Sequence, residues 1–473
     1  MVEALFVVPF LSGILSLYFN ENHRKILLMV ISIIHLFLSL MLWFTHPQPW
    51  FESYFKLSPE GLLVLLITSF LFLLITVYTV NYFKASDMQG KRLFICFMLL
   101  FLSTMSMAAL ADHLMVLWIA IEATTLASAP LIIVQRSKKS LEATLKYIMI
   151  CSVGIALALL GSLFIIISME TGGVDVNISF SELTRLDAQL DPKWLKAGFI
   201  FILVGYGTKM GLAPMHTWLP DAHSESPSPV SALLSGVLLN CAYLGIFKTN
   251  RILYAAGLET FSSTILIVFG LISIIVASIF ILRQSDYKRL LAYSSIENMG
   301  IIAFGTGIGG LAAFGAILHL IHHSLIKSAL FLSSGNIFLA YHSKQIKQTG
   351  NMIQLLPKTF VSFFGGFAGI SGFPPFGMFI SEFCIIMGAF QKGYYISVGI
   401  FMVVLAILIV GLARHVIHIG FSPTNQDISF KERYALVIPQ YIMLLISAIL
   451  CFWIPDTLHR TILAAISTIG GGF

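Results

Sequence analysis

The sequence predicts an all-α polytopic membrane protein with about 14 transmembrane helices. Hydrophobic residues make up 58% of the 473 residues and charged residues only 11%, whereas a soluble domain usually contains about 25% charged residues. The mean hydropathy is +0.91. Most apolar segments are about 18 to 25 residues long, which is the length of a helical span. They lack the alternating pattern of an outer-membrane barrel strand, so we expect helices.

The predicted spans follow one another with mostly short connections. We expect them at residues 4–19, 25–44, 60–83, 92–110, 114–134, 142–168, 197–218, 228–249, 259–283, 288–309, 311–341, 358–390, 394–415 and 437–455. The first segment has neither a cationic leader nor a small-residue cleavage site, so we interpret it as a span and not as a signal peptide. The longest connection, 169–196, is expected to form a short solvated element. Its acidic residues are Asp175, Glu182, Asp187 and Asp191.

The distribution of positive charge predicts the orientation. Loops after odd-numbered helices carry about twice as many Lys and Arg residues as the other loops and the C-terminal tail. By the positive-inside rule, the odd loops face the cytoplasm and both termini lie outside, in a multi-pass protein of the cell inner membrane. The net charge of +6 reflects these loops. A nucleic-acid partner is therefore not implied.

Two of the predicted helices are interrupted at corresponding places. The seventh carries Lys209 and is broken at Gly211–Pro214, and the twelfth is broken at Ser371–Gly377 and followed by Glu382. Paired interrupted helices indicate a repeat-built transporter, and an offset of five helices requires inverted copies. We expect two inverted five-helix repeats, helices 4–8 and 9–13. The domains are then 1–90 (helices 1–3), 91–250 (first repeat), 251–418 (second repeat) and 419–473 (helix 14 and tail).

Charged residues inside the membrane are the first candidates for function, because burying charge in lipid is expensive. Glu122 lies more than two helical turns past His113, too deep for its carboxylate to reach water along the helix. Lys209 lies beside a helix break, where freed backbone groups are tolerated if they line a water-filled path. We predict protonatable roles for both; the alternative is that Glu122 is a purely structural partner for a neighbouring helix.

Helix 311–341 has the densest polar stripe. His319, His323 and Lys327 follow one another at four-residue spacing and lie on one helix face, and His322 lies off it. An imidazole can donate and accept protons near neutral pH, so the stripe indicates a stepwise proton path. Single histidines are more often satisfied core residues. A metal site is disfavoured, because no carboxylate or thiol completes the ligand set.

Two acid–base pairs are expected to act as switches. Burial disfavours the charged forms of lysine and glutamate, and a nearby opposite charge favours them. A lysine therefore releases its proton when its carboxylate moves away and holds a proton when the two meet. The candidate pairs are Glu122 with Lys209 and Lys327 with Glu382.

Further polar residues are open to two interpretations. Glu142 and Lys146 are spaced as an ordinary surface pair, although Lys146 lies one turn deeper and is included in the predicted proton path. Glu297 follows two cations and is expected at the interface. Three residues after the first break could admit protons or simply be solvated: Asp221, His223 and Glu225.

The cysteines give no sign of redox chemistry. All five are isolated in apolar segments, without CxxC or mixed Cys/His spacing. We expect no iron–sulfur cluster, structural zinc or disulfide framework, and no metal or catalytic centre in this chain.

Four motifs in order resemble the antiporter-like proton-channel subunits of respiratory complex I, Mrp antiporters and membrane-bound hydrogenases. They are the Glu122 segment WIAIEATTLASAPLI, GTKMGLAPMHTWLPDAHSESPSPVSALL (207–234), the HxxxHxxxK stripe and GFPPFGMFISEF before and around Glu382. The resemblance covers nearly the whole chain, most convincingly about 60–415. Within the group, LEATLKYIMICSVGIALALLG (141–161) and SALLSGVLLNCAYLGIFK (231–248) are most similar to hydrogenase-4 component F.

The resemblance implies a fourteen-helix fold with a central hydrophilic axis. On it, Glu122 and Lys209 match the family's glutamate–lysine pair, and Lys146 matches a common family lysine. The second half-channel matches at His319, His323, Lys327 and Glu382. Asn240 stands where many complex I relatives have a second lysine, so the half-channels are expected to communicate through water or His319. The long lateral helix of the largest relatives is not evident, which argues against that role.

The expected function is translocation of protons, or of sodium ions, in a redox-driven respiratory complex. Iron–sulfur clusters and a nickel–iron centre would belong to partners: other membrane subunits, a peripheral nickel–iron hydrogenase and iron–sulfur subunits. The alternatives are a subunit of an Mrp-type cation/proton antiporter, an independent solute permease, or a structural membrane anchor for a peripheral enzyme.

Overall fold

A computed structural model describes residues 1–86, 90–174, 176–186, 189–424, 428 and 430–469. Secondary structure in these residues is helical, with three isolated β-bridges. The elements of the N-terminal half are α1 (Ala4–Leu15), η1 (Ser16–Tyr18), α2 (Glu21–Thr45), α3 (Pro59–Ala85), α4 (Lys91–Leu110), α5 (Leu114–Ile132), η2 (Ile133–Gln135), α6 (Lys138–Thr171), α7 (Phe180–Leu183), α8 (Pro192–Met210), η4 (Met215–Thr217), α9 (Trp218–Glu225), α10 (Ser228–Leu233), η5 (Leu234–Leu238) and α11 (Leu239–Ala255).

The C-terminal half continues with the same architecture. Its elements are α12 (Glu259–Ile281), α13 (Tyr287–Ile308), α14 (Leu311–Tyr341), η6 (Ile346–Gln348), α15 (Met352–Leu355), α16 (Pro357–Ile370), α17 (Met378–Gln391), α18 (Tyr395–Phe421), η7 (Tyr434–Leu436), α19 (Ile438–Phe452) and α20 (Asp456–Ile466). The expected all-helical fold class is thus confirmed.

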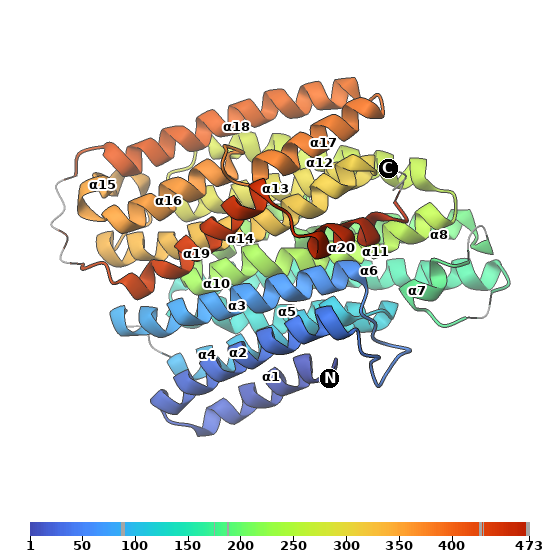
Figure 1. The fold of residues 1–473 in the computed structure, drawn as a ribbon, viewed down its shortest axis with the longest axis horizontal. Coiled ribbons are helices and arrows are strands. Elements are labelled where there is room, and N and C mark those ends of the chain that lie inside the picture. The colour runs from blue at the N-terminus through green and yellow to red at the C-terminus, as the bar shows by residue number, and fades with distance from the viewer. Residues whose placement is uncertain (87–89, 175, 187–188, 425–427, 429, 470–473) are drawn as a thin grey trace.

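The long helices lie side by side and run along the long axis of the molecule (Figure 1). α1 and α2 form one edge, α18 forms the opposite edge, and α10 and α14 lie between them. The short helices α7 and α15 lie at opposite ends of the bundle. We call these the α7 end and the α15 end; the predicted orientation makes them the outer and inner ends.

Ten helices in the described part of the chain are long and apolar enough to cross a membrane, or eleven if the bent pair α19–α20 forms one span. Two shorter apolar helices, Ala4–Tyr18 and α17, add to them. The membrane class is therefore supported. The count of fourteen spans and the inverted repeats stay predictions.

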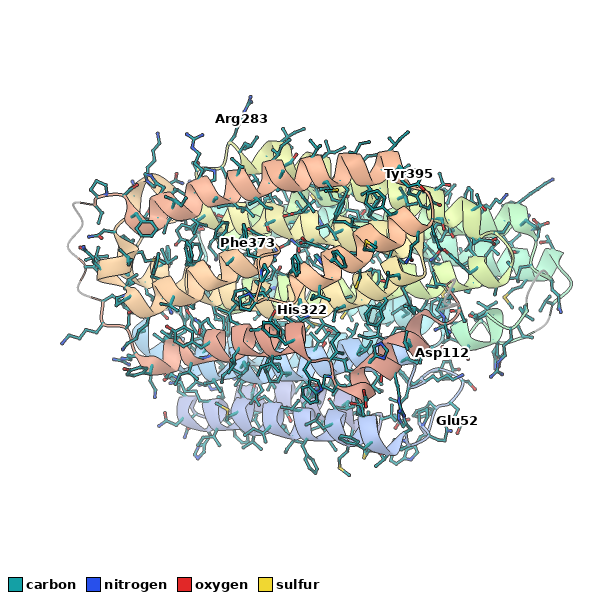
Figure 2. All side chains as sticks on the ribbon, turned by 45° about the horizontal axis from the view of Figure 1, so that its top comes forward. Glu52, Asp112, Arg283, His322, Phe373 and Tyr395 are labelled. Carbon is teal, nitrogen blue, oxygen red and sulfur yellow. The ribbon has the colours of Figure 1, made fainter. Side chains whose placement is uncertain are left out.

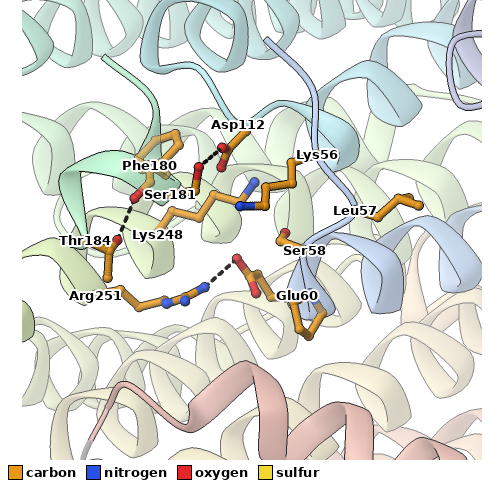
Figure 3. A pocket seen from close by; sticks show the side chains of 11 residues that line it. Lys56, Leu57, Ser58, Glu60, Asp112, Phe180, Ser181, Thr184, Lys248 and Arg251 are labelled. Carbon is orange, nitrogen blue, oxygen red and sulfur yellow. Dashed lines mark hydrogen bonds and ion pairs between the residues drawn. The ribbon is translucent and has the colours of Figure 1, made fainter. Parts of the chain in front are cut away.

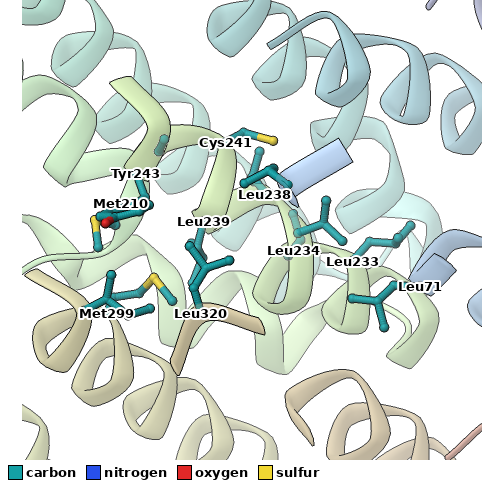
Figure 4. Packing of buried hydrophobic residues seen from close by; sticks show 14 of the residues in the cluster. Leu71, Met210, Leu233, Leu234, Leu238, Leu239, Cys241, Tyr243, Met299 and Leu320 are labelled. Atoms are coloured by element: carbon teal, nitrogen blue, oxygen red, sulfur yellow. The ribbon is translucent and has the colours of Figure 1, made fainter. Parts of the chain in front are cut away.

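Two central segments are surrounded entirely by other helices. Their apolar windows, in Ser228–Ala255 and in α14, are 100% buried, whereas those of α2 and α18 at the edges are 33% buried. Figure 4 shows Leu233 and Leu239 of the first segment among residues of neighbouring helices, including Leu71 of α3. Polar side chains on these central helices are consequently kept away from lipid.

The connection 169–196 forms the predicted short element, but it is held down by apolar contacts. α7 buries Phe180 and Leu183, and a β-bridge joins Ser179 to His113. Asp191 caps the N-terminus of α8 by accepting hydrogen bonds from two backbone N–H groups. Asp175 and Asp187 lie outside the described residues.

The chain turns sharply after the last predicted span. α19 and α20 meet at an 80° bend, and α20 lies across the α7 end. The backbone N–H of Gly310 donates to Ile469 O, and the ring of His459 packs on Phe314 at 5.4 Å. A span prediction based on hydropathy missed α20, because it is short and polar on one side.

Helices α6 and α8 pack closely through glycines. A Cβ at Gly161 would lie 2.7 Å from Gly198 O, and a Cβ at Gly198 would lie 2.9 Å from Gly161 O. Such contacts are typical of membrane helix pairs, because small residues let backbones approach.

We therefore expect Gly198→Ala to destabilise the protein by about 1–3 kcal/mol, because the added methyl group overlaps backbone atoms of α6. Gly399→Ala in α18 is the matched control: nothing lies within 4 Å of its would-be Cβ. Thermal unfolding of both variants in detergent measures the difference. Equal melting temperatures would contradict the close-packing account.

Candidate functional site

The first helix break lies between α8 and η4, as expected from the sequence. α8 ends at Met210, and Gly211 takes a left-handed conformation with φ of 86°, which favours glycine. The indole N–H of Trp218 donates to Thr208 O at 2.8 Å, which satisfies one carbonyl freed by the break. Lys209 lies in the last turn of α8, where the helix dipole favours a cation.

The Lys209 side chain is fully buried and reaches two hydroxyl groups. Its Nζ donates to Thr125 Oγ1 at 2.5 Å and to Tyr147 OH at 2.8 Å. The ammonium also lies 4.8 Å from the centroid of the Tyr147 ring. These contacts join α8 to α5 and α6.

Glu122 belongs to the same cluster but does not touch Lys209. Its Oε2 accepts from Thr125 Oγ1 at 3.3 Å, and its Oε1 accepts from Ser152 Oγ at 3.2 Å. Thr125 therefore stands between the predicted acid and base. The acid and the base are thus separated by one hydroxyl group.

Sequence reasoning missed the hydroxyl groups of this cluster. Thr125 lies one turn after Glu122, so the spacing could have indicated it. Tyr147 and Ser152 lie on α6, and only the packing of α5, α6 and α8 brings them to the pair.

The second helix break lies between α16 and α17, again as expected. α16 ends at Ile370, and Gly372 has a φ of 68°. A Cβ at position 372 would overlap the Oε2 atom of Glu382, so glycine also makes room for that carboxylate. Figure 2 shows Phe373, in this break, and His322 near mid-length of the bundle.

His319 connects three helices in the second half. Its Nε2 pairs with Asn298 Oδ1 of α13, and its Nδ1 pairs with Ser381 Oγ of α17, each at 2.9 Å. Ser381 precedes Glu382, and Asn298 follows Glu297. His319 thus lies between the two carboxylate-bearing segments, although the sequence indicated neither of its partners.

His323 is fully buried, and neither of its ring nitrogens has a hydrogen-bond partner in the described part of the chain. The groups that act on it electrostatically are Lys327, His319 and His223. His322, off the stripe, pairs with Ser447 Oγ of α19 at 3.0 Å. Of these histidines, His322 is held by α19, and His323 has only electrostatic neighbours.

Lys327 has a backbone partner and a carboxylate neighbour that the sequence did not indicate, and its pairing with Glu382 stays a prediction. Its buried Nζ donates to Leu291 O at 2.7 Å, and the carboxylate that attracts it is that of Glu297. Glu382 in turn interacts with Glu297. The expectation of an interfacial Glu297 was wrong, because α13 packs against α14 and leaves this residue only 3% exposed.

Asn240 follows a π-helical turn, η5, in the central helix. Its Nδ2 donates to Ser324 Oγ of α14 at 2.8 Å, and its Oδ1 has no partner in the described residues. Cys241, the next residue, is an electrostatic neighbour of Lys209. Asn240 therefore lies between the Lys209 cluster and the histidine helix.

Lys146 and Glu142 lie in a charged cavity of about 340 Å³ at the α15 end. Lys146 contacts Glu142 at 2.7 Å and Asp221 at 3.2 Å, and Arg289 also pairs with Asp221. The Lys146 side chain is 47% exposed. Both interpretations of this pair stay open, since an exposed ion pair can be structural or can line a water-filled approach.

His223 is not at the surface. It is fully buried, its ring stacks on Phe331 at 4.8 Å, and both nitrogens lack partners in the described residues. The solvated interpretation is wrong for His223, because α9 folds back between α6 and α13. Its electrostatic neighbours are Lys288 and Lys327.

The family model described as NADH:quinone oxidoreductase/Mrp antiporter, TM, matches residues 111–409, which is more than half of the chain. This chain belongs to that family. The expected resemblance is confirmed, and the protein is an antiporter-like membrane protein of the complex I, Mrp and hydrogenase-4 group.

Two curated relatives carry hydrogenase names. A hydrogenase-4 component F homolog of Methylacidiphilum infernorum is 37% identical over 363 residues, covering 75% of this chain and 76% of the relative. Hydrogenase-4 component B of Escherichia coli is 30% identical over 362 residues, covering 74% of this chain. The aligned part spans 53% of component B.

Two solved structures share the antiporter-like fold over nearly the whole chain. A membrane-bound sulfane sulfur reductase, an archaeal respiratory membrane complex, matches with a TM-score of 0.87 and 20% identity, covering 99% of this chain and 98% of the other. The Mrp complex of Dietzia sp. matches with a TM-score of 0.85 and 18% identity, covering 99% and 96%. Both belong to multi-subunit membrane complexes.

The chain has no group of three or more His, Cys, Asp and Glu side chains able to hold a metal ion in its described ranges.

Proposed function

We propose that this antiporter-like protein translocates protons within a redox-driven respiratory complex, of which a membrane-bound nickel–iron hydrogenase is the favoured form. The Lys209 cluster carries the proposal. A fully buried lysine lies one threonine hydroxyl away from a carboxylate. A pair held at that separation can exchange protons when it closes and opens.

The proposed route runs through the middle of the bundle. Protons would be taken up at the α15 end, pass Lys209 and Asn240, and continue through Ser324 to the helix of His323 and Lys327. Glu297 and Glu382 would deliver them toward the outer side. Hydrogen bonds at Thr125, Ser324 and His319 support the individual links.

The hydrogenase assignment rests on the two relatives with hydrogenase-4 names. Nickel–iron and iron–sulfur chemistry would be located in partner subunits. Transport of sodium ions instead of protons would use the same carboxylates but would need several oxygen ligands around the ion. The Lys209 and Lys327 ammonium groups occupy the central positions, so we favour protons.

Gentle purification of the tagged chain from its native membrane, followed by mass spectrometry of co-eluting subunits, is expected to recover hydrogenase and iron–sulfur proteins. A tagged, unrelated multi-pass protein of the same membrane is the control for non-specific recovery. Mrp-like partners would support the cation/proton antiporter alternative. Cation transport by the purified single chain in liposomes would instead support a permease and contradict a subunit role.

A further inference from the structure

A second cluster of buried charges lies at the α7 end, away from both helix breaks. It surrounds a cavity of about 230 Å³, large enough for several water molecules. Figure 3 shows the side chains converging from the loop before α3, from α3 itself, and from α7 and α11. The charged residues that line it are Lys56, Glu60, Asp112, Lys248 and Arg251.

Lys248 is the most deeply placed cation of this cluster. It is 2% exposed; its Nζ donates to Ala111 O at 2.5 Å and lies 5.6 Å from the centroid of the Phe180 ring. An ammonium group has three N–H donors. No carboxylate of the described residues forms an ion pair with it, so the charge is stabilised only by a carbonyl, a ring and longer-range interactions.

Glu60 supplies an unpaired acceptor to the same cavity. It is 2% exposed, and its Oε1 accepts from Arg251 at 2.9 Å. Its Oε2 is buried and has no hydrogen-bond partner in the described part of the chain. A buried carboxylate oxygen without a donor is costly unless water or a proton reaches it. Glu60 is one of the residues that line the cavity.

The charged groups around Lys248 act in opposite directions on its protonation. Glu60 and Asp112 attract its ammonium group, and Arg251 and Lys56 repel it. Asp112 is itself tied to Ser181 by a hydrogen bond at 2.5 Å. A lysine with equal numbers of carboxylates and cations around it is a group that small local movements can protonate or deprotonate.

The cluster is connected to the central axis by α11. Asn240 lies eight residues before Lys248 on this helix, about 12 Å away along its axis. Between them, Tyr243 OH pairs with Thr306 Oγ1 at 2.8 Å, and Tyr243 interacts electrostatically with Glu60. Polar groups therefore follow α11 from the axis toward the cavity.

We propose that this cavity is a proton-release site of the first half of the protein, with Lys248 as the donor and Glu60 as the acceptor. The Lys248 ammonium loses one proton and becomes an amine, Glu60 Oε2 takes up that proton through cavity water, and the carboxylic acid then releases it to the solvent at the α7 end. The proposal rests on the proposed proton translocation and gives the first half an outlet of its own, separate from Glu382.

Proton release by the intact complex in proteoliposomes tests the proposal, with a pH-sensitive dye on the side of the α7 end. Lys248→Met and Lys248→Arg are both expected to lose the share of the proton flux that leaves by this outlet, while the share that leaves past Glu382 continues, because neither Met nor Arg gives up a proton. Glu60→Gln, which retains an oxygen for Arg251, is expected to lose flux as well. Lys193→Met, at an exposed lysine of the same end, is the matched control and should release protons as the native protein does.

The outcomes separate this proposal from the function on which it rests. Normal flux in Lys248→Arg would overturn it, since a cation alone would then suffice, as in a structural or anion-binding site. Normal flux in Lys248→Met would also overturn it. Lys209→Met tests the proposed function itself. If that variant still translocates protons, the proposed function is wrong. If a Lys248 variant does not assemble, Glu60→Gln decides the matter in the same assay.

Discussion

Replacing Lys209 with methionine is expected to reduce proton translocation to the level of passive leak. Methionine fills a similar volume but cannot carry a proton, and Thr125 and Tyr147 lose the ammonium that they bind. Proteoliposomes containing the complex, driven by the substrate of its peripheral subunits, measure the loss. Electron transfer by those subunits, uncoupled with an ionophore, should continue.

Two further variants test the separated pair behind this prediction. Glu122→Gln keeps a carbonyl oxygen that accepts from one of the two hydroxyl groups, Thr125 or Ser152, and an amide that can donate to the other, but it removes the acid. It should also abolish translocation, whereas a purely structural membrane anchor would retain full energy coupling. Thr125→Val has nearly the same shape and keeps both charges, so we expect a partial loss. Normal flux in Lys209→Met would contradict the central role of this lysine.

Replacing Lys327 with methionine is expected to have an equally large effect in the second half. Lys327 is the only cation that acts electrostatically on Glu297 in the described part of the chain. Its loss removes the proton donor between the histidine stripe and the two carboxylates. The same proteoliposome assay measures it, with Lys347→Met, at an exposed lysine of the α15 end, as the matched control.

The second prediction also decides which carboxylate is the immediate partner of Lys327. Glu297→Gln should impair translocation at least as strongly as Glu382→Gln, because Glu297 interacts electrostatically with both Lys327 and Glu382. If Glu297→Gln translocates normally and Glu382→Gln does not, the direct pairing expected from the sequence would be restored.

Sequence reasoning reached the fold class and most of the residues of the candidate site. Long apolar segments predict spans, because lipid requires every backbone polar group to be satisfied within a helix. Gly211–Pro214 and Ser371–Gly377 identify the two interruptions, because glycine and proline end helices locally. Lys209 lies just before the first interruption, and Glu382 lies just after the second. These signals depend on neighbours along the chain.

The partners of those residues could not be predicted in the same way. Thr125 lies 84 residues from Lys209, and Ser381 lies 62 residues from His319. Glu297 resembled an interfacial residue because it follows Lys288 and Arg289, but α13 turns it into the bundle. Lys248 could not be identified as a candidate from the sequence, because nothing in its own segment indicates that Glu60 lines the same cavity.

Hydropathy and helix breakers were enough to predict a helical membrane protein with two broken helices and a set of acids and bases inside the membrane. Hydropathy and helix breakers act over a few residues, so they can be read in one dimension. The packing of the helices places Thr125 between Glu122 and Lys209 and brings Glu297 into the electrostatic neighbourhood of Lys327, neither of which the sequence indicates. Those relations arise from side-chain packing between helices that are distant in sequence.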